Sequence, residues 1–517
     1  MKSQETTTIS MKYRILIVLL SLFGTGIILF ATYNYGAGIT PDSVGYIATA
    51  RHIADGMGFI TYNNAPLIVQ PPLYPIILGA VDFVLRIDPL LSANVVSAIL
   101  FGLSLYLSGV LFFKHLTLSP IFALLGTASL LTSIPLVIVF FMAWSEPLFI
   151  FFLILYLIAI LIYSEKKNIK TLLLLSLSVA LACLTRYIGV ILVLTGIISI
   201  FLIQKDNVKN KFSHTFIFTF ASVLPIGIWV GRNFFLSETL FGPRYPSLHT
   251  LFDNIRYTFD TIVSWYLPSR ITDSRPILML LSLIIGFLVC MIFVWAKTPI
   301  TALLKQTRPL IVFILLVIIG YIGFLIISST TTNYDSINYR LLSPIVVPIT
   351  LILFSAIEIL FKLIKQRFTS KPVESIFVAG IILWLIFPAK VTVLNVINQF
   401  NEGTGFSAYY WEDSHTIQYI RDHNLSNCTI YSNGADVTYL LLNINVKPIP
   451  SKSSGANVIA DLSSLNNSFP QENKACLVWF NHITRKYLFT PDELISITNL
   501  EQVIQLDDGT IYVVSKK

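Results

Sequence analysis

The sequence predicts a polytopic α-helical membrane protein with about 11 transmembrane helices, amphipathic interfacial helices in the first outward loop, and a small C-terminal mixed α/β extracytoplasmic domain. Of the 517 residues, 55% are hydrophobic and only 12% are charged, which excludes a soluble globular protein. Apolar stretches long enough to cross a bilayer recur along most of the chain. From residue 398 onward the composition becomes polar, which indicates a separate domain.

Each predicted span is an apolar stretch of roughly the length that a bilayer requires. The eleven stretches are residues 13–33, 94–113, 119–141, 145–163, 171–185, 187–203, 212–233, 276–296, 309–328, 341–361 and 372–396. The first lacks a convincing cleavage site of small residues, so we expect a retained helix and not a signal peptide.

Charge determines how the short stretches around Arg186 are interpreted. Three lysines lie between residues 166 and 170, and three more lie between residues 205 and 211. Because positively charged loops stay in the cytoplasm, both clusters are expected inside, and the chain must turn back at Arg186. The resulting topology places the N-terminus in the cytoplasm and the C-terminal domain outside.

The two sides of this topology differ in their basic residues. Within residues 1–397, the inner side carries 14 Lys and 3 Arg, whereas the outer side carries 1 Lys and 9 Arg. The outer arginines are Arg51, Arg86, Arg186, Arg232, Arg244, Arg256, Arg270, Arg275 and Arg340. A preference for guanidinium indicates bidentate recognition of phosphate or carboxylate. Arginines that only anchor helices at the interface are the alternative.

The first outward loop, residues 34–93, contains the leading candidate for a catalytic group. Asp42 follows Pro41 and precedes residues that recur at helical spacing along one face, which predicts an amphipathic helix on the membrane surface. The carboxylate would lie at the start of this helix. An ordinary N-cap is the alternative role for Asp42.

Ionisable residues also occur at the outer ends of later spans. Glu146 lies between two apolar stretches, where a charge is costly and therefore indicates function, although an acid in a first helical turn is the alternative. Arg186 and Tyr187 stand at the predicted hairpin tip, and the cation requires either Glu146 or a bound phosphate as its partner.

Two further segments contribute candidate ligands. Arg232 ends the seventh span and Arg244 follows in the next loop, ahead of apolar residues between 252 and 265 whose helical spacing predicts a second interfacial helix. Tyr339 and Arg340 precede the tenth span, where the arginine is a candidate phosphate ligand and the tyrosine a platform for a sugar or an isoprenoid. Interface anchoring remains the alternative for these cations.

The C-terminal segment alternates short apolar stretches with turns. Residues 428–432, 438–443, 475–480, 503–506 and 511–514 are typical of strands, the last two flanking an Asp-Asp-Gly hairpin turn, and residues 413–422 have a helical pattern. Cys428 and Cys476 flank predicted strands and either pair in an oxidising compartment or remain buried thiols. No cluster in the chain has the spacing of metal ligands.

Several short motifs, in this order, resemble the GT-C superfamily of membrane glycosyltransferases, especially protein O-mannosyltransferases and the bacterial transferases that attach aminoarabinose to lipid A. They are Thr-Pro-Asp-Ser-Val-Gly-Tyr at 40–46, Pro-Pro-Leu-Tyr-Pro at 71–75, Trp-Ser-Glu-Pro-Leu-Phe at 144–149, Leu-Thr-Arg-Tyr at 184–187, and Trp-x-x-Arg-Asn at 229–233. The resemblance covers about residues 11–360 and does not extend to the tail.

The resemblance implies that Asp42 is a catalytic base. Many relatives carry two adjacent acids or an acid-x-acid motif where this chain has Asp42-Ser43, so participation of a divalent metal ion is left open. The expected partners are a polyprenyl-phosphate sugar donor, an acceptor that is a glycan, lipid or protein, and membrane lipids, with no nucleic acid. The candidate residues for binding the donor are Glu146, Arg186, Tyr187, Arg232, Arg244, Tyr339 and Arg340.

The predicted organisation is therefore a GT-C-like transmembrane domain at residues 1–397 and a soluble extracytoplasmic α/β domain at 398–517. The predicted reaction transfers a hexose or pentose from the polyprenyl-phosphate donor, with inversion, at the outer face of the membrane. Two other functions remain open: a lipid or polysaccharide transporter, and an inactive relative that acts as a binding scaffold. A transporter would place its ionisable groups near mid-bilayer.

Overall fold

The computed structural model describes residues 11–116, 119–204, 208–268, 309–367, 371–423, 425, 428–452, 462–465 and 469–517. The predicted span at 276–296 lies outside the described residues, as do Arg270 and Arg275. The other predicted spans all fall on helices.

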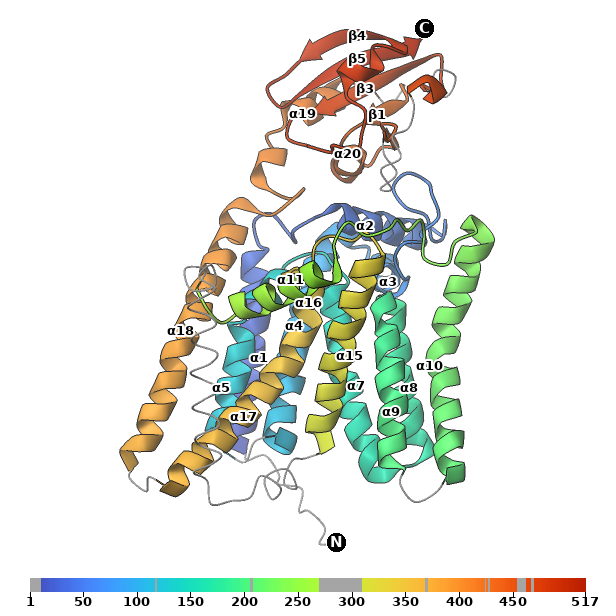
Figure 1. Ribbon diagram of the computed structural model, residues 1–517. Coiled ribbons are helices and arrows are strands. Elements are labelled where there is room, and N and C mark those ends of the chain that lie inside the picture. The colour runs from blue at the N-terminus through green and yellow to red at the C-terminus, as the bar shows by residue number, and fades with distance from the viewer. Residues whose placement is uncertain are drawn as a thin grey trace.

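Long helices stand side by side in a bundle, and the C-terminal domain lies beyond one end of it (Figure 1). The first half contains α1 (Met11–Ala31), α2 (Pro41–Ala54), α3 (Leu73–Leu85), α4 (Pro89–Leu111), η1 (Phe112–Leu116), α5 (Pro120–Leu131), α6 (Ile134–Phe140), α7 (Glu146–Lys166) and α8 (Ile169–Thr185). The second half contains η2 (Tyr187–Gly189), α9 (Val190–Ile203), α10 (Val208–Ser237), α11 (Leu251–Ser264), α15 (Pro309–Thr331), α16 (Tyr339–Leu342), η3 (Ser343–Ile345), α17 (Val346–Arg367) and α18 (Lys371–Glu402).

The helices identify an integral, multi-pass membrane protein. Among the described residues, seven helices are long and apolar enough to cross a membrane, or eight if the bent pair α5 and α6 is one span. Helices α8 and α9 are apolar but shorter than a full span. The predicted number of eleven spans is therefore not confirmed.

The predicted turn at Arg186 is present. Helix α8 ends at Thr185, Arg186 is extended, and α9 begins at Val190 and runs back beside α8 (Figure 1). Gly189 makes this turn close, because a Cβ there would lie 2.8 Å from backbone atoms of Ala182 and Cys183. Only glycine allows this approach without a shift of the backbone.

Helix α2 differs from the amphipathic surface helix that the sequence predicts. Residues 43–50 are buried without interruption, so this stretch of the helix has no exposed polar face. Helix α3 packs along α2, and the C-terminal domain covers it from the other side (Figure 1). The sequence pattern does not reveal this burial of α2, because the domain that covers the helix is formed by the opposite end of the chain.

Helix α11 is the second predicted interfacial helix, and it lies across the bundle near the end that carries α2 (Figure 1). Phe252 and Phe259 are exposed, whereas the polar residues Asn254 and Thr258 are buried. An apolar exposed face and a polar inner face are typical of a helix in contact with lipid.

The C-terminal domain is built on a five-stranded mixed sheet with the order β2-β1-β3-β5-β4. Its elements are η4 (Tyr409–Trp411), α19 (His415–Asp422), β1 (Ile430–Ser432), α20 (Ala435–Leu442), β2 (Val446–Pro448), η6 (Leu462–Leu465), β3 (Lys474–Phe480), α21 (Pro491–Leu494), β4 (Thr498–Gln505) and β5 (Gly509–Lys516). Strands β2, β1 and β3 are parallel, whereas β5 runs antiparallel to both β3 and β4.

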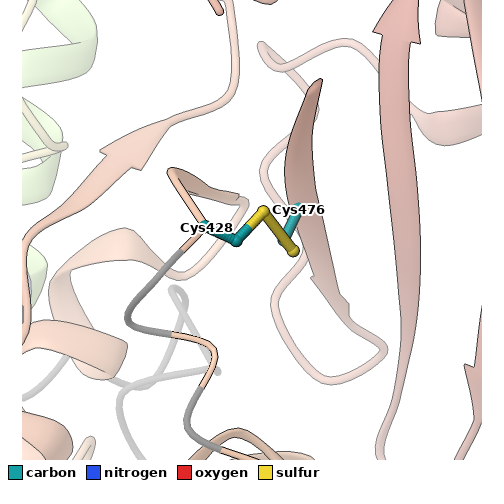
Figure 2. The surroundings of a disulfide bond; sticks show 2 residues. All are labelled: Cys428 and Cys476. Carbon is teal, nitrogen blue, oxygen red and sulfur yellow. A yellow bond between two sulfur atoms is a disulfide. The ribbon is translucent and has the colours of Figure 1, made fainter. Parts of the chain in front are cut away.

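Most predicted elements of this domain are confirmed, with one exception. The predicted strand at 438–443 is part of helix α20, which connects the parallel strands β1 and β2. Parallel neighbours require a crossover connection, usually a helix, and a short apolar stretch alone does not distinguish a helix from a strand. Cys428 forms a disulfide with Cys476, which lies in β3, as Figure 2 shows.

Candidate functional site

Asp42 is not the N-cap of α2. Thr40 occupies the cap position, and Ser43 Oγ accepts a hydrogen bond from the backbone N–H of Thr40 at 3.1 Å. The Asp42 carboxylate instead accepts a hydrogen bond from Gln70 Nε2 at 3.3 Å and lies 2.7 Å from Arg340 Nη2. Its side chain is 42% exposed, so one acid in this site is open to solvent.

Glu146 is the buried centre of the same charge network. Its Oε1 atom lies 2.5 Å from Arg186 Nη1 and 2.7 Å from Arg340 Nε, and its side chain is fully buried. Arg340 therefore binds both acids at once, Asp42 through Nη2 and Glu146 through Nε. The network contains two carboxylates and two guanidinium groups and is electrically balanced.

The four charged residues come from different parts of the chain, but each lies at or near the end of a helix. Asp42 is in the first turn of α2, Glu146 begins α7, Arg186 follows α8, and Arg340 lies in α16. They are therefore grouped at one end of the bundle and not at the middle of the spans. This placement disfavours the transporter interpretation, which requires ionisable groups near mid-bilayer.

Aromatic side chains hold this network in position. The guanidinium carbon of Arg340 lies 4.2 Å from the ring centroid of Trp144, and the Trp144 indole N–H donates to Thr40 Oγ1 at 2.8 Å. Tyr46 and Ser145 are 3.1 Å apart through their hydroxyl oxygens. Burial raises the pKa of Tyr46, so its hydroxyl stays neutral.

A second cluster surrounds Tyr187. The Tyr187 hydroxyl donates to the Ile68 carbonyl at 2.8 Å and accepts hydrogen bonds from Trp229 and Asn233. Arg232 Nη1 donates to the Leu67 carbonyl at 2.8 Å. These contacts fix the loop around residues 67–68 against the end of α10.

Residues 67–70 connect the two clusters. The carbonyls of Leu67 and Ile68 face the second cluster, whereas the amide of Gln70 reaches Asp42 in the first. Arg186 and Tyr187, which are adjacent in sequence, likewise divide between the two clusters. The structure thus places the charge network and the Tyr187 cluster side by side.

Arg232 and Arg244 have no carboxylate partner among the residues that the structure describes. The guanidinium of Arg232 stacks on Trp229 at 4.4 Å, and that of Arg244 lies 5.4 Å from the ring of Tyr334. The positive charges of these two side chains are therefore not compensated by an ion pair. Tyr339 is 41% exposed at the start of α16.

Sequence reasoning did not assign roles to five residues of the site. Gln70, Trp144, Ser145 and Asn233 each contact a predicted site residue, and Tyr46 contacts Ser145. Four of the five belong to the motifs described above, so adjacency to Asp42, Glu146 and Arg232 was the available signal. Gln70 immediately precedes such a motif. No sequence pattern showed which side chains these five residues would contact.

In the described part of the chain, no group of three or more His, Cys, Asp and Glu side chains could hold a metal ion. Asp42 and Glu146, the two acids of the network, are both neutralised by arginine. The described residues of this network therefore do not form a ligand set for a divalent cation.

No protein-family model matches the sequence, and no curated protein is significantly similar to it. Solved structures are informative instead. ArnT from Cupriavidus metallidurans bound to undecaprenyl phosphate superposes with a TM-score of 0.60 at 11% identity, and the match covers 98% of each chain. The chain has the GT-C fold.

A second structure with the GT-C fold extends the comparison. The archaeal oligosaccharyltransferase AglB from Archaeoglobus fulgidus, in complex with an inhibitory peptide and a dolichol-phosphate, has a TM-score of 0.53 at 10% identity. That match covers 91% of this chain and 69% of AglB. At such low identity the likeness concerns the fold, while the match to ArnT includes the C-terminal domain.

Proposed function

We propose that this protein is a glycosyltransferase that moves a hexosyl or pentosyl group from a polyprenyl-phosphate donor to an acceptor hydroxyl, with inversion at the anomeric carbon. The observation that carries the proposal is the pairing of a solvent-accessible carboxylate with a buried ion network at one end of a GT-C bundle. ArnT and AglB, whose fold this chain shares, were solved with undecaprenyl phosphate and a dolichol-phosphate respectively.

Asp42 is the proposed general base because of its accessibility. The Asp42 side chain is 42% exposed, whereas Glu146 is fully buried behind two arginines. A general base must come within hydrogen-bond distance of the proton that it accepts, directly or through one water molecule. Of the two acids in the network, only Asp42 meets this requirement.

The proposed reaction is a single displacement. The acceptor oxygen attacks the anomeric carbon and gives its proton to Asp42, while the bond between that carbon and the phosphate oxygen breaks. The departing polyprenyl phosphate keeps the electron pair of the broken bond and gains one negative charge. A single displacement of this kind inverts the anomeric centre.

Two arginines match the charge of the departing phosphate. Arg232 and Arg244 have aromatic contacts but no carboxylate partner among the described side chains, so they can accept an anion without breaking an ion pair. Positive groups directed at a developing charge stabilise the transition state more than the ground state. We assign binding of the donor phosphate to Arg232 and Arg244, which lie next to Tyr187.

Glu146 and Tyr339 are assigned to the sugar. Glu146 Oε2 is buried and has no hydrogen-bond partner among the described residues, although Oε1 binds two arginines. A buried oxygen without a donor is costly, and a sugar hydroxyl would satisfy it once donor binding displaces the side chains that cover Glu146. The half-exposed ring of Tyr339 offers a flat apolar surface next to Arg340. Arg186 and Arg340 hold the two acids in place.

We further propose that the N-terminus is cytoplasmic and that residues 398–517 form an extracytoplasmic domain above a membrane part at residues 1–397. The lysine clusters of the loops support this orientation. The Cys428–Cys476 disulfide also supports it, because disulfides persist in oxidising compartments. The acceptor would then approach from the side of the C-terminal domain.

The test compares the wild type with Asp42→Asn and with Asp55→Asn, a matched change of an exposed acid at the other end of α2. Cell-surface lipids, glycans and proteins are analysed by mass spectrometry with and without each variant. We expect wild type and Asp55→Asn to add the same pentose or hexose, and Asp42→Asn to reduce this addition by about 10²- to 10⁴-fold.

Membrane insertion and the melting temperature of Asp42→Asn should remain close to those of the wild type, because the substitution keeps the size of the side chain. Near-normal glycosylation by Asp42→Asn would remove the assignment of the base. Absence of any added sugar with the wild type would remove the transferase proposal itself.

A further inference from the structure

The segment just before Asp42 is the middle of a junction between three segments of the chain. The Gly38 N–H donates to the Phe141 carbonyl at 2.9 Å, and the Ala143 N–H donates to the Gly38 carbonyl at 2.9 Å. On the other side, the Ile39 N–H donates to the Thr404 carbonyl at 3.1 Å. The junction therefore joins residues 38–39, 141–143 and 404–406.

Both acids of the site extend from this junction. Asp42 follows residues 38–39 after two intervening residues, and Glu146 follows residues 141–143 after two more. The hydrogen bond from Trp144 to Thr40 connects these two branches directly. The third branch, residues 404–406, leads to neither acid. It forms backbone hydrogen bonds with Ile39, in the branch that leads to Asp42.

That third branch connects α18 to the C-terminal domain. The Phe406 N–H donates to the Ile39 carbonyl at 2.9 Å, and the Phe406 side chain packs against both the core of the membrane part and the core of the C-terminal domain. Gly405 lies opposite Ile39 with φ of +68°, and a Cβ there would lie 2.0 Å from the Ile39 carbonyl oxygen.

The far end of α2 is also held by the C-terminal domain. Arg51 binds both carboxylate oxygens of Asp88, which caps α4, at 2.8 and 3.0 Å. The same guanidinium lies 5.9 Å from the ring centroid of Tyr439 on α20. Tyr439 is buried and also contacts Tyr62 from the first loop.

We propose that the C-terminal domain positions the base: it holds α2 at the start through Gly405 and at the end through Tyr439, so that Asp42 stays aligned for transfer. Gly405 and Tyr439 are positioning residues and do not touch substrate. This inference rests on the proposed function of Asp42 but assigns to the domain a role that the transfer reaction alone does not require.

A matched pair of glycine variants tests the first contact. Gly405→Ala forces the junction to move, because the new Cβ would collide with the Ile39 carbonyl. Gly36→Ala has nearly the same backbone requirement, with φ of +71°, but its Cβ would meet no atom of the described residues within 4 Å. The pair therefore separates displacement of residues 38–39 from the general cost of alanine at a positive φ.

Purified full-length protein in lipid nanodiscs is assayed for kcat and for the donor KM. We expect Gly405→Ala to lower kcat by roughly 10- to 100-fold, since a shift of about 1 Å in a catalytic group has an effect of this size. The donor KM should change by less than about threefold, because Arg232 and Arg244 are not displaced. Gly36→Ala should keep both constants close to the wild-type values.

Hydrogen exchange provides a readout that does not depend on activity. We expect the backbone amides of residues 44–54 to exchange faster in Gly405→Ala than in wild type or Gly36→Ala. Tyr439→Leu, which removes the ring facing Arg51, should have the same effect, while Tyr419→Leu, whose ring stacks on His423 within the domain, should not.

The outcomes separate this inference from the proposed function. An active wild type with unchanged kcat and unchanged α2 exchange in Gly405→Ala and Tyr439→Leu overturns the positioning role. If Gly405→Ala does not fold, the hydrogen exchange of α2 and the kcat of Tyr439→Leu decide whether the C-terminal domain has the positioning role. An inactive wild type overturns the proposed function, whereas the exchange data still test the coupling.

Discussion

Replacement of Arg340 by lysine is the most direct test of the charge network. Arg340 Nη2 lies 2.7 Å from Asp42 and Arg340 Nε lies 2.7 Å from Glu146, so one planar group serves two acids. A lysine ammonium is a compact point charge and cannot occupy both positions. We expect it to stay with Glu146, because the loss of a cationic partner costs a fully buried carboxylate more than a half-exposed one.

The expected size of the effect follows from the lost contact. Arg340→Lys removes the charge-assisted hydrogen bond to Asp42, and such bonds contribute about 1.5–3 kcal/mol. If that bond aligns the base in the transition state, kcat should fall by roughly 10- to 150-fold, since each 1.36 kcal/mol changes a rate tenfold. The stacking of a lysine on Trp144 is weaker but preserves the local packing.

The assay measures kcat and KM for sugar transfer in nanodiscs, together with the melting temperature. Arg256→Lys is the matched control, because Arg256 forms an exposed pair with Asp260 on α11, and exposed pairs contribute little. Its kinetic constants should equal those of the wild type. Wild-type kcat in Arg340→Lys would refute the view that this guanidinium aligns Asp42.

Two further predictions concern the C-terminal domain of the full-length protein. Replacing both Cys428 and Cys476 by serine should lower the free energy of unfolding of this domain by up to about 4 kcal/mol, measured by denaturant titration, because the disulfide closes a loop across a separation of 48 residues. Hydrogen bonds from Thr490, and then from Lys452, lower the pKa of Glu493, so its contribution to stability is present above the unfolded-state pKa and is lost as the pH falls through the lowered folded-state value. Melting temperatures between pH 3 and 6 should therefore fall more steeply toward acid for wild type than for Glu493→Gln, and parallel curves would contradict this reasoning.

The membrane helices were predictable because each apolar stretch carries its own signal. The turn at Arg186 was predictable for a different reason: lysines on both sides of it indicated that the chain returns. The number of spans was less secure, because α8 and α9 are shorter than a bilayer requires and the stretch 276–296 lies outside the described residues. Length and hydropathy alone do not decide such cases.

The contacts of the site could be predicted only in part. The sequence singled out Glu146 and Arg186 because an ionisable group between apolar stretches is costly in a membrane protein. It singled out Asp42 and Arg340 because each stands at the outward start of a predicted helix. It contained no signal that Gln70 would reach Asp42, since hydrogen-bond geometry is not encoded in spacing. The burial of α2 was equally hidden, because the surface that covers it is formed by residues near 440.

The pairing of Ile39 with Gly405 also constrains how the protein is made. These residues are 366 positions apart, the same separation as the hydrogen bond from Asn34 to the Phe400 carbonyl. At a synthesis rate of about 5–20 residues per second, roughly 20 to 70 s pass between the emergence of the two segments from the ribosome. During that interval a nascent chain already carries Asp42 but lacks residues 404–406, so the segment before Asp42 stays without this contact until the final membrane helix has been made.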